Sequence, residues 1–410
     1  MADFNIDSII SAIKTTLPQD KQPPVALHEP CFKGNEWAYI KECIDTSWVS
    51  YVGKYVDRFE EMLADYTGVK KAMAIVNGTA ALQIALKLIG IQPGDEVLVP
   101  VLTFVATANA VVHCGGVPHF VDSEEKTLGM DPQKLKDYLR DICRVNSDVC
   151  TNKQTGRQIK AVIPMHTFGH PVDLDPLAEI CHEYKLEMIE DAAESLGSFY
   201  KGKHTGNWGK LSILSFNGNK TITTGGGGAI ITNDEELGKL AKHLTTTAKI
   251  PHRWEYRHDH IGYNFRLPNI NAALGCAQME QLPGFLEKKR ALATRYQHAF
   301  KNVEGVKFFS EPPHAKSNYW LNVILLDEPA LEQRDKLLEK TNDSGIMTRP
   351  VWTLLNKLAM FQDCPSMDLS CANNLEARLI NIPSSSFFRG KESIKGMRGT
   401  SQNYRKDTMI

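Results

Sequence analysis

Between residues 70 and 235 the chain alternates seven short apolar runs with segments of helical periodicity. Such runs, nearly free of polar residues, are typical of strands that helices cover on both faces. In the intervening segments, for example 79–90 and 173–185, apolar residues recur every three or four positions. The pattern predicts an α/β fold with a mostly parallel, seven-stranded sheet. The runs are 72–77, 96–101, 117–122, 160–165, 186–191, 211–216 and 228–233.

The sequence beyond this region predicts a second, smaller unit. After Arg266 a periodic apolar segment continues to about residue 300, either as one long helix or as two helices in line that are broken near Pro283. Strands and helices then alternate again. We therefore predict an N-terminal extension over 1–27, a large domain over 28–270, a small C-terminal α+β domain over 271–388 and a disordered basic tail over 389–410.

The composition excludes several classes of partner. Of 410 residues, 42% are hydrophobic and 23% charged, and the net charge is −1, so nothing predicts binding to nucleic acid or to an anionic membrane. No apolar run is long enough to span a bilayer, and the first residues lack the features of a signal peptide. The nine cysteines form no CxxC pair. These observations predict a reduced, cytoplasmic protein with buried thiols.

One short stretch combines a lysine with a run of glycines. Residues 215–228 read SFNGNKTITTGGGG, so that Lys220 lies between an apolar run and Gly225–Gly228. Consecutive glycines indicate a tight turn or a close approach of the backbone to another group. A lone lysine after a strand is usually a surface residue, but a lysine amine held beside a carbonyl can form a Schiff base. Ser215 could donate to a phosphate.

Three further strand ends carry residues that suit a ligand, because the carboxyl ends of parallel strands form the ligand crevice of an α/β sheet. Gly78 and Thr79 open a helix whose first N–H groups could bind a phosphate, although an ordinary N-cap turn also explains them. Asp191 could hold a protonated ring nitrogen or only cap a helix. Phe104 is either a core residue or a ring that stacks on a flat ligand.

Together these groups match what pyridoxal 5′-phosphate (PLP) requires from a protein. They supply a phosphate cup, a carboxylate for the pyridine nitrogen, a ring that stacks on the cofactor and a lysine for its aldehyde. The carboxylate matters because a protonated pyridine withdraws electrons from the substrate carbon that loses a proton. The chain between Asp191 and Lys220 has room for one helix or loop and one strand, so both can lie in one crevice. The sequence predicts these two residues as catalytic.

Six motifs run through the chain in the order NGTAAL, TFVATANAV, MHTFGHP, EDAAESLG, SFNGNKTITTGGGG and GYNFRLPNINAAL. With them, residues 25–385 resemble the DegT-type family of fold-type I, PLP-dependent sugar aminotransferases. The resemblance implies that Lys220 binds the cofactor's aldehyde and Asp191 its pyridine nitrogen. It further implies cofactor contacts from Gly78, Thr79 and Ser215 to the phosphate and from Phe104 to the ring.

The resemblance also assigns residues outside this central set. Asn264 resembles the asparagine that reaches the phosphate of the neighbouring subunit, which implies a homodimer with shared active sites. Glu194 departs from the many relatives that have Gln or His near the ring hydroxyl of the cofactor, and an ionised carboxylate cannot donate a hydrogen bond. Arg349 and Trp352 fall where the family builds its substrate wall. They either contact the sugar nucleotide or have only a surface or packing role.

A narrower resemblance concerns the substrate. Residues 28–60, the polar insertion 144–159 and residues 244–252 resemble the branch associated with legionaminic acid and bacillosamine synthesis. This implies transfer of an amino group from L-glutamate to a nucleotide-linked keto sugar, first of all UDP-4-keto-6-deoxy-N-acetylglucosamine. The alternatives are a GDP-linked 4-keto sugar, an oxidised 3-deoxyoctulosonate and a non-catalytic regulatory relative. Lys220 argues against a PLP-dependent sugar dehydratase, because such relatives have histidine at that position.

Overall fold

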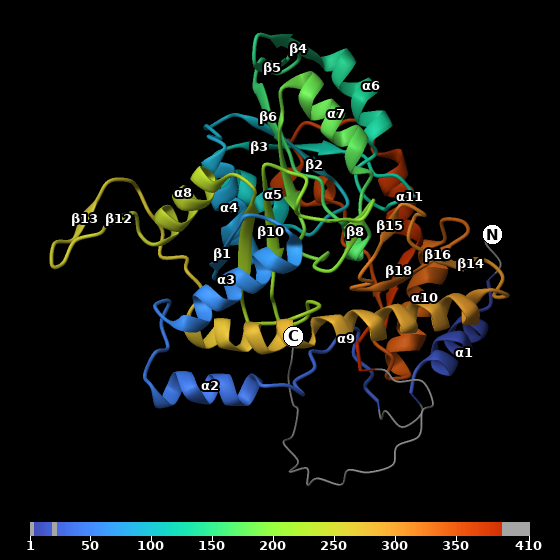
Figure 1. Ribbon diagram of the computed structural model, residues 1–410. Coiled ribbons are helices and arrows are strands. Elements are labelled where there is room, and N and C mark those ends of the chain that lie inside the picture. The colour runs from blue at the N-terminus through green and yellow to red at the C-terminus, as the bar shows by residue number, and fades with distance from the viewer. Residues whose placement is uncertain (1–3, 19–22, 388–410) are drawn as a thin grey trace.

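The computed structural model describes residues 4–18 and 23–387. A large, mostly parallel sheet covered by helices and a smaller antiparallel sheet lie along one long helix, α9 (Asn269–Phe300) (Figure 1). This helix is continuous through Pro283, so the first of the two expected arrangements is present. The tail predicted for 389–410 lies outside the described residues, and the division into domains near residue 270 stays a prediction.

All seven predicted runs form strands of the large sheet, in the order β1-β11-β10-β7-β6-β2-β3. Neighbouring strands are parallel, except that β11 is antiparallel to both β1 and β10. Helices cover both faces, and β2 and β11 are therefore buried along their whole length. The insertion near 144–159 adds the hairpin β4–β5 beside β6. The strands are β1 (Lys71–Ile75), β2 (Glu96–Pro100), β3 (Val117–Val121), β4 (Cys143–Asn146), β5 (Val149–Asn152), β6 (Gln158–Val162), β7 (Glu187–Asp191), β10 (Leu211–Ser215) and β11 (Gly228–Thr232).

The helices that cover this sheet bury apolar stripes against it. On one face Ile84 of α4 shares a core with Ile230 of β11, and on the other Phe59 of α3 shares a core with Leu214 of β10. Side chains cap three of these helices, α4, α6 and α8, and at α8 Asp234 accepts from two backbone N–H groups of the first turn. These helices are α3 (Lys54–Thr67), α4 (Gly78–Leu88), α5 (Ala106–His113), α6 (Pro132–Ile142), α7 (Leu174–Tyr184) and α8 (Glu235–Thr245), whereas α2 (Glu36–Asp45) packs on α9.

The smaller sheet is antiparallel throughout, in the order β14-β16-β18-β17. The N-terminal helix α1 (Ile6–Thr16) packs here, because Ile9 and Ile13 share a core with Leu292 and Tyr296 of α9. The N-terminal helix therefore stabilises the smaller sheet and the half of α9 that packs on it. The remaining elements are β8 (Phe199–Tyr200), β9 (Lys203–His204), β14 (Val306–Phe308), β15 (Ala315–Lys316), β16 (Asn322–Leu326), β17 (Arg349–Pro350), β18 (Leu379–Ile382), α10 (Leu331–Asp343), α11 (Ser370–Arg378) and the 3-10 turns η1 (Thr167–Gly169), η2 (Leu355–Lys357) and η3 (Ala359–Phe361).

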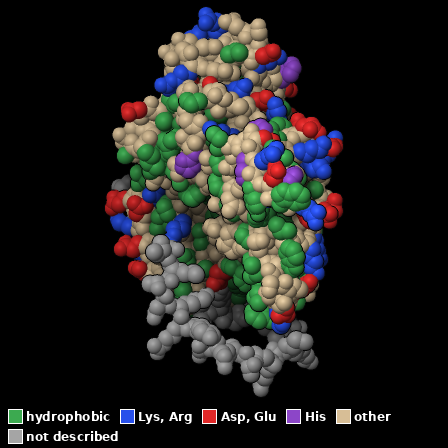
Figure 2. All heavy atoms as spheres, turned by 90° about the vertical axis from the view of Figure 1, so that its left-hand side faces the viewer, with side chains coloured by type: hydrophobic (Ala, Val, Ile, Leu, Met, Phe, Trp, Pro, Cys, Tyr) green, Lys and Arg blue, Asp and Glu red, His purple; other side chains and the backbone are tan. Residues whose placement is uncertain are grey.

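Between α8 and α9 the chain forms a hairpin of β12 (Lys249–Ile250) and β13 (Arg257–His258) that projects from the body (Figure 1). The hairpin and the segment after it expose large apolar side chains, with Trp254 70%, Tyr256 78% and Ile261 89% exposed. Figure 2 shows this side of the molecule, where hydrophobic side chains lie at the surface among charged ones.

The nine cysteines are all free, and each is buried or half-buried. The prediction of unpaired, sheltered thiols is confirmed. Among the residues that the structure describes, no helix has both the length and the apolar character needed to cross a membrane.

Candidate active site

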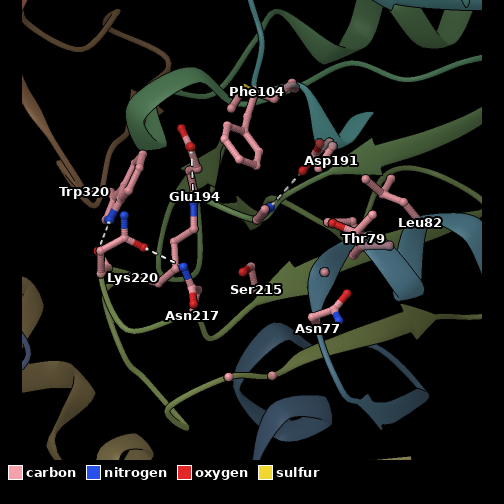
Figure 3. Close-up of a pocket in the computed structure, with 18 of the residues that line it drawn as sticks. Asn77, Thr79, Leu82, Phe104, Asp191, Glu194, Ser215, Asn217, Lys220 and Trp320 are labelled. Carbon is pink, nitrogen blue, oxygen red and sulfur yellow. Dashed lines mark hydrogen bonds and ion pairs between the residues drawn. The ribbon is translucent and has the colours of Figure 1, made fainter. Parts of the chain in front are cut away.

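The carboxyl ends of neighbouring strands border one cavity of about 230 Å³ (Figure 3). Asp191, the last residue of β7, bridges to Met165 after β6, and β10 beside it ends at Ser215. All the predicted cofactor residues except Asn264 line this cavity, and of the two candidates for the substrate wall Trp352 lines it and Arg349 does not. The lining includes Asn77, Gly78, Thr79, Phe104, Met165, Asp191, Glu194, Ser215, Lys220, Gly226, Gly227, Trp320 and Trp352.

The glycine run shapes the loop that carries the lysine. The loop closes on itself through hydrogen bonds from Phe216 N to Gly227 O (2.8 Å) and from Thr224 N to Phe216 O (3.0 Å). At Gly228 a Cβ atom would lie 2.6 Å from the carbonyl carbon of Asn77. Only glycine therefore lets β11 pass directly against the start of α4.

The start of α4 offers donors for a phosphate. Asn77 caps the helix, because its Oδ1 accepts from the N–H of Ala80 at 2.8 Å. Gly78 and Thr79 follow, and Ser215 lies opposite them, with its Cβ 3.3 Å from where a Cβ of Gly78 would be. Backbone N–H groups at a helix N-terminus together with two hydroxyl groups form a donor set that suits a phosphate.

Asp191 is buried and lines the same cavity (Figure 3). Its Oδ2 accepts from Thr107 Oγ1 at 2.8 Å, and its Oδ1 accepts from the N–H of Ala193 at 3.2 Å. Burial raises the pKa of this carboxyl above its ordinary value, while these hydrogen bonds oppose the rise. A cationic N–H in the cavity would stabilise the ionised form, and a pyridinium nitrogen supplies one.

Lys220 and Glu194 form an ion pair in the cavity (Figure 3). The Nζ of Lys220 lies 3.2 Å from Glu194 Oε1 and 3.9 Å from the centre of the Trp320 ring. The other carboxyl oxygen of Glu194 accepts from the N–H of Phe168 at 2.9 Å. Burial raises the pKa of Glu194 to about 7, although Lys220 acts in the opposite direction. Glu194 can therefore hold a proton near neutral pH, and a protonated carboxyl donates as the family's Gln or His does.

Aromatic rings line the mouth of the cavity. The ring of Phe104 points into it (Figure 3) and lies 6.4 Å from that of Trp352, centre to centre. Trp352 lies 5.1 Å from the ring of Phe168. Trp352 lines the cavity, and its contact with a substrate stays a prediction. Arg349 is outside the lining, where it is exposed and donates to Asn342 Oδ1 at 3.3 Å.

Asn264 lies away from the cavity of its own chain. It is exposed and forms an antiparallel bridge with Thr246, beside the base of the hairpin β12–β13. This position leaves the predicted contact with a neighbouring subunit as a prediction.

Sequence reasoning missed two residues that complete the site. Thr107 lies one helical turn beyond Thr103 in TFVATANAV, and the two hydroxyls are 3.1 Å apart. Its place near a strand end is a signal that could have indicated it. Trp320 comes from a distant stretch, SNYWL, and is fixed by a hydrogen bond from its Nε1 to Asn219 O at 2.7 Å. No local pattern points to that contact.

The residues present fit PLP, because the cavity joins a phosphate donor set, a buried carboxylate, an exposed aromatic face and a lysine amine. Fold and cavity together define the class of fold-type I PLP-dependent enzymes.

The chain belongs to the DegT/DnrJ/EryC1/StrS aminotransferase family, whose sequence profile matches residues 30–395. It is a PLP-dependent aminotransferase, as the motifs predicted. Over 361 residues it is 38% identical to GDP-perosamine synthase of Escherichia coli O157:H7, covering 88% of this chain and 93% of that protein. Over 295 residues it is 33% identical to the UDP-4-amino-4,6-dideoxy-N-acetyl-beta-L-altrosamine transaminase of Campylobacter jejuni, covering 72% and 74%. PseC of Helicobacter pylori, an aminotransferase of pseudoaminic acid biosynthesis, matches with a TM-score of 0.81 at 25% identity, over 89% of this chain and 95% of that one.

Proposed function

We propose that this protein transfers an amino group from L-glutamate to the keto carbon of a nucleotide-linked 4-keto-6-deoxy sugar. UDP-4-keto-6-deoxy-N-acetylglucosamine is the first candidate acceptor, on the strength of the motifs in 28–60 and 244–252. The observation that carries the proposal is the convergence of the Lys220 amine, the Asp191 carboxylate and the N-terminus of α4 on one cavity. The names of relatives that act on GDP- and UDP-linked amino sugars support a nucleotide sugar.

Bound PLP supplies a protonated ring that withdraws electrons from the substrate carbon that loses its proton. In this proposal Asp191 keeps the ring nitrogen protonated by accepting its N–H, and Thr107 fixes the carboxylate at 2.8 Å. Thr79 and Ser215, with the N–H groups of α4, bind the phosphate. Phe104 covers one face of the ring and excludes water from it.

Lys220 acts twice. With PLP bound, its amine would hold the cofactor by the aldehyde, and Nζ would also be the group that takes up and returns the proton of the reacting substrate carbon. Glu194, at 3.2 Å from Nζ, keeps the amine directed toward the cavity. The amino donor and the keto sugar use the same cavity in turn, which predicts ping-pong kinetics.

A GDP-linked 4-keto-6-deoxy sugar is the second candidate acceptor. GDP-perosamine synthases of three bacteria are 34–38% identical to this chain and align with 88% of it. The relative named for a UDP-linked sugar aligns with 72% at 33% identity. These figures favour GDP, whereas the motifs favour UDP.

The two acceptors are separated by one experiment. Purified enzyme with PLP and L-glutamate is given each nucleotide sugar, and amino-sugar formation is followed by mass spectrometry. We expect kcat/KM to be at least about tenfold higher for the UDP sugar, which is about 1.4 kcal/mol of transition-state discrimination. The opposite preference would assign the GDP sugar. No amino sugar from either, with cofactor bound and Lys220→Ala as blank, would refute the proposed substrate class.

We further propose a homodimer in which each subunit contributes Asn264 to its partner's phosphate site. The support is the exposed position of Asn264 outside its own cavity and the apolar surface beside it, which includes Trp254, Tyr256 and Ile261. Apolar side chains this exposed are typical of an interaction surface.

Subunit mixing tests the shared site. Lys220→Ala and Asn264→Ala chains are mixed, so that one site of the heterodimer combines both intact residues. Loss of a charge-assisted hydrogen bond of about 1.5–3 kcal/mol should weaken PLP binding by Asn264→Ala homodimers roughly 10- to 150-fold. Activity at limiting PLP should therefore rise above the sum of the two homodimers. No rise, despite subunit exchange confirmed by mass, would remove Asn264 from the partner's site.

A further inference from the structure

A cluster of two histidines and an aspartate lies at the base of the projecting hairpin. His243 belongs to the last turn of α8, and Asp259 and His260 directly follow β13. The Oδ1 of Asp259 lies 2.6 Å from His243 Nε2 and 2.8 Å from His260 Nδ1. Two parts of the chain that lie 16 residues apart thus direct their side chains to one carboxylate oxygen.

The three donors are close enough to share one ion. Their donor atoms all lie within 4.8 Å of one another, and no other group of three or more His, Cys, Asp or Glu side chains in the described part of the chain meets this condition. The ion pairs of Asp259 are with these two imidazoles, whereas nearby Lys242 pairs with Glu60 and Arg257 with Glu255.

The chemistry of the three side chains suits a cation. A histidine whose proton is on the nitrogen that faces away from Asp259 offers a lone pair from the nitrogen that faces it. Two imidazole nitrogens and one carboxylate oxygen then offer three ligand atoms within 4.8 Å of one another.

We propose that His243, Asp259 and His260 bind one divalent transition-metal ion, such as Zn²⁺, at the base of the hairpin. Imidazole nitrogen and carboxylate oxygen are ordinary zinc ligands at about 2 Å, whereas Mg²⁺ and Ca²⁺ prefer sites made of oxygen alone. Three protein ligands leave a position for water. Small movements of the exposed side chains of Asp259 and His260 bring the donors to these bond lengths.

The ion would join the hairpin to the end of α8. The same region holds the bridge between Thr246 and Asn264 and a hydrogen bond from His258 Nδ1 to Thr247 O at 2.8 Å. A metal at the cluster therefore fixes the segment that carries Asn264, and it acts as a structural ion that no catalytic step requires. Its presence is independent of the substrate assigned above.

Calorimetric titration of the full-length holoenzyme with Zn²⁺, after dialysis against a chelator and in phosphate-free buffer, tests the site. We expect one ion per chain, and His243→Ala or His260→Ala should weaken this binding at least roughly 100-fold, since outer-shell changes alone cost 10- to 100-fold. The matched control is His298→Ala, which removes an exposed histidine from the end of α9 and should bind as wild type does. Equal binding by all four proteins would overturn the proposal.

Thiols also bind Zn²⁺, and the chain has nine free cysteines. Titration with Co²⁺ distinguishes metal bound by cysteines from metal bound by the proposed cluster. Thiolate ligands add charge-transfer absorption, whereas imidazole and carboxylate ligands do not add it. We expect Co²⁺ to bind without these bands in wild type. Asp259→Asn keeps the shape of the side chain and replaces the alanine variants if these fail to fold. This variant should lose the Co²⁺ absorption that wild type shows. Thiolate bands at one equivalent, or an Asp259→Asn signal equal to wild type, would refute the site.

Discussion

The buried carboxyl of Glu194 predicts how the stability of the protein without cofactor depends on pH. The pKa of this group rises from 4.5 to about 7 in the folded chain. Below about pH 4.5 both the folded and the unfolded chain hold the proton. Between about pH 4.5 and about pH 7 the unfolded chain has lost this proton and the folded chain keeps it, so the free energy of unfolding decreases as pH rises. Above about pH 7 the folded chain must hold a buried charge.

The size of the effect follows from this difference in pKa. At about 1.4 kcal/mol per pH unit, wild type should lose about 3 kcal/mol of unfolding free energy across the window. Glu194→Gln has no proton to lose and accepts the N–H of Phe168 as before. The variant should therefore gain about 2–3 kcal/mol over wild type as pH rises from about 5 to about 8.

Urea unfolding of both apoproteins, at one protein concentration and a series of pH values, measures this difference. Glu179→Gln is the control, because it makes the same chemical change at an exposed position of α7, outside the cavity. A Glu194→Gln difference that does not change with pH would refute the reasoning. A difference of the opposite sign would mean that the ion pair with Lys220 outweighs the cost of burial.

Four further substitutions test the proposed roles. Lys220→Ala should keep wild-type circular dichroism but lose the borohydride-sensitive absorbance of bound PLP; retention of that band would exclude the assignment. Asp191→Asn should bind PLP and lose most of kcat, and a rate within about tenfold of wild type would assign the ring nitrogen to another residue. Thr107→Val should lower kcat roughly tenfold at unchanged PLP affinity, since one hydrogen bond to a charged group is lost; an unchanged kcat would contradict this. Gly228→Ala should destabilise the fold by about 1–3 kcal/mol, read as a lower melting temperature, because its Cβ meets the backbone of Asn77; a wild-type melting temperature would contradict the close approach.

The strand ends explain why much of the site could be predicted from sequence. Asp191 and Ser215 end buried strands of the same sheet, and in a parallel sheet such ends meet at one edge. Their meeting follows from hydrophobic pattern alone. The glycine run marked the place where β11 approaches α4, because a requirement for glycine can be read without knowing the neighbour.

Other features depend on contacts that no local pattern encodes. A fully buried run reads the same in either direction, so the antiparallel course of β11 could not be read from its residues. Trp320 reaches the site through the packing of the C-terminal part of the chain. The docking of α1 on α9 likewise pairs two segments that are far apart in the sequence, which sequence periodicity cannot match to each other.

The position of β1 at the edge of the large sheet has a consequence for biosynthesis. Its strand partner is β11, and Ile75 also bridges to Arg266. A growing chain therefore cannot pair β1 until residue 232 has been made. Until then β1 and the first turn of α4 lack the strand that packs against them. Their apolar side chains stay exposed during this time, and chaperones can bind them. Fragments that end before Gly228 should consequently accumulate as aggregates, while cofactor binding begins only late in synthesis.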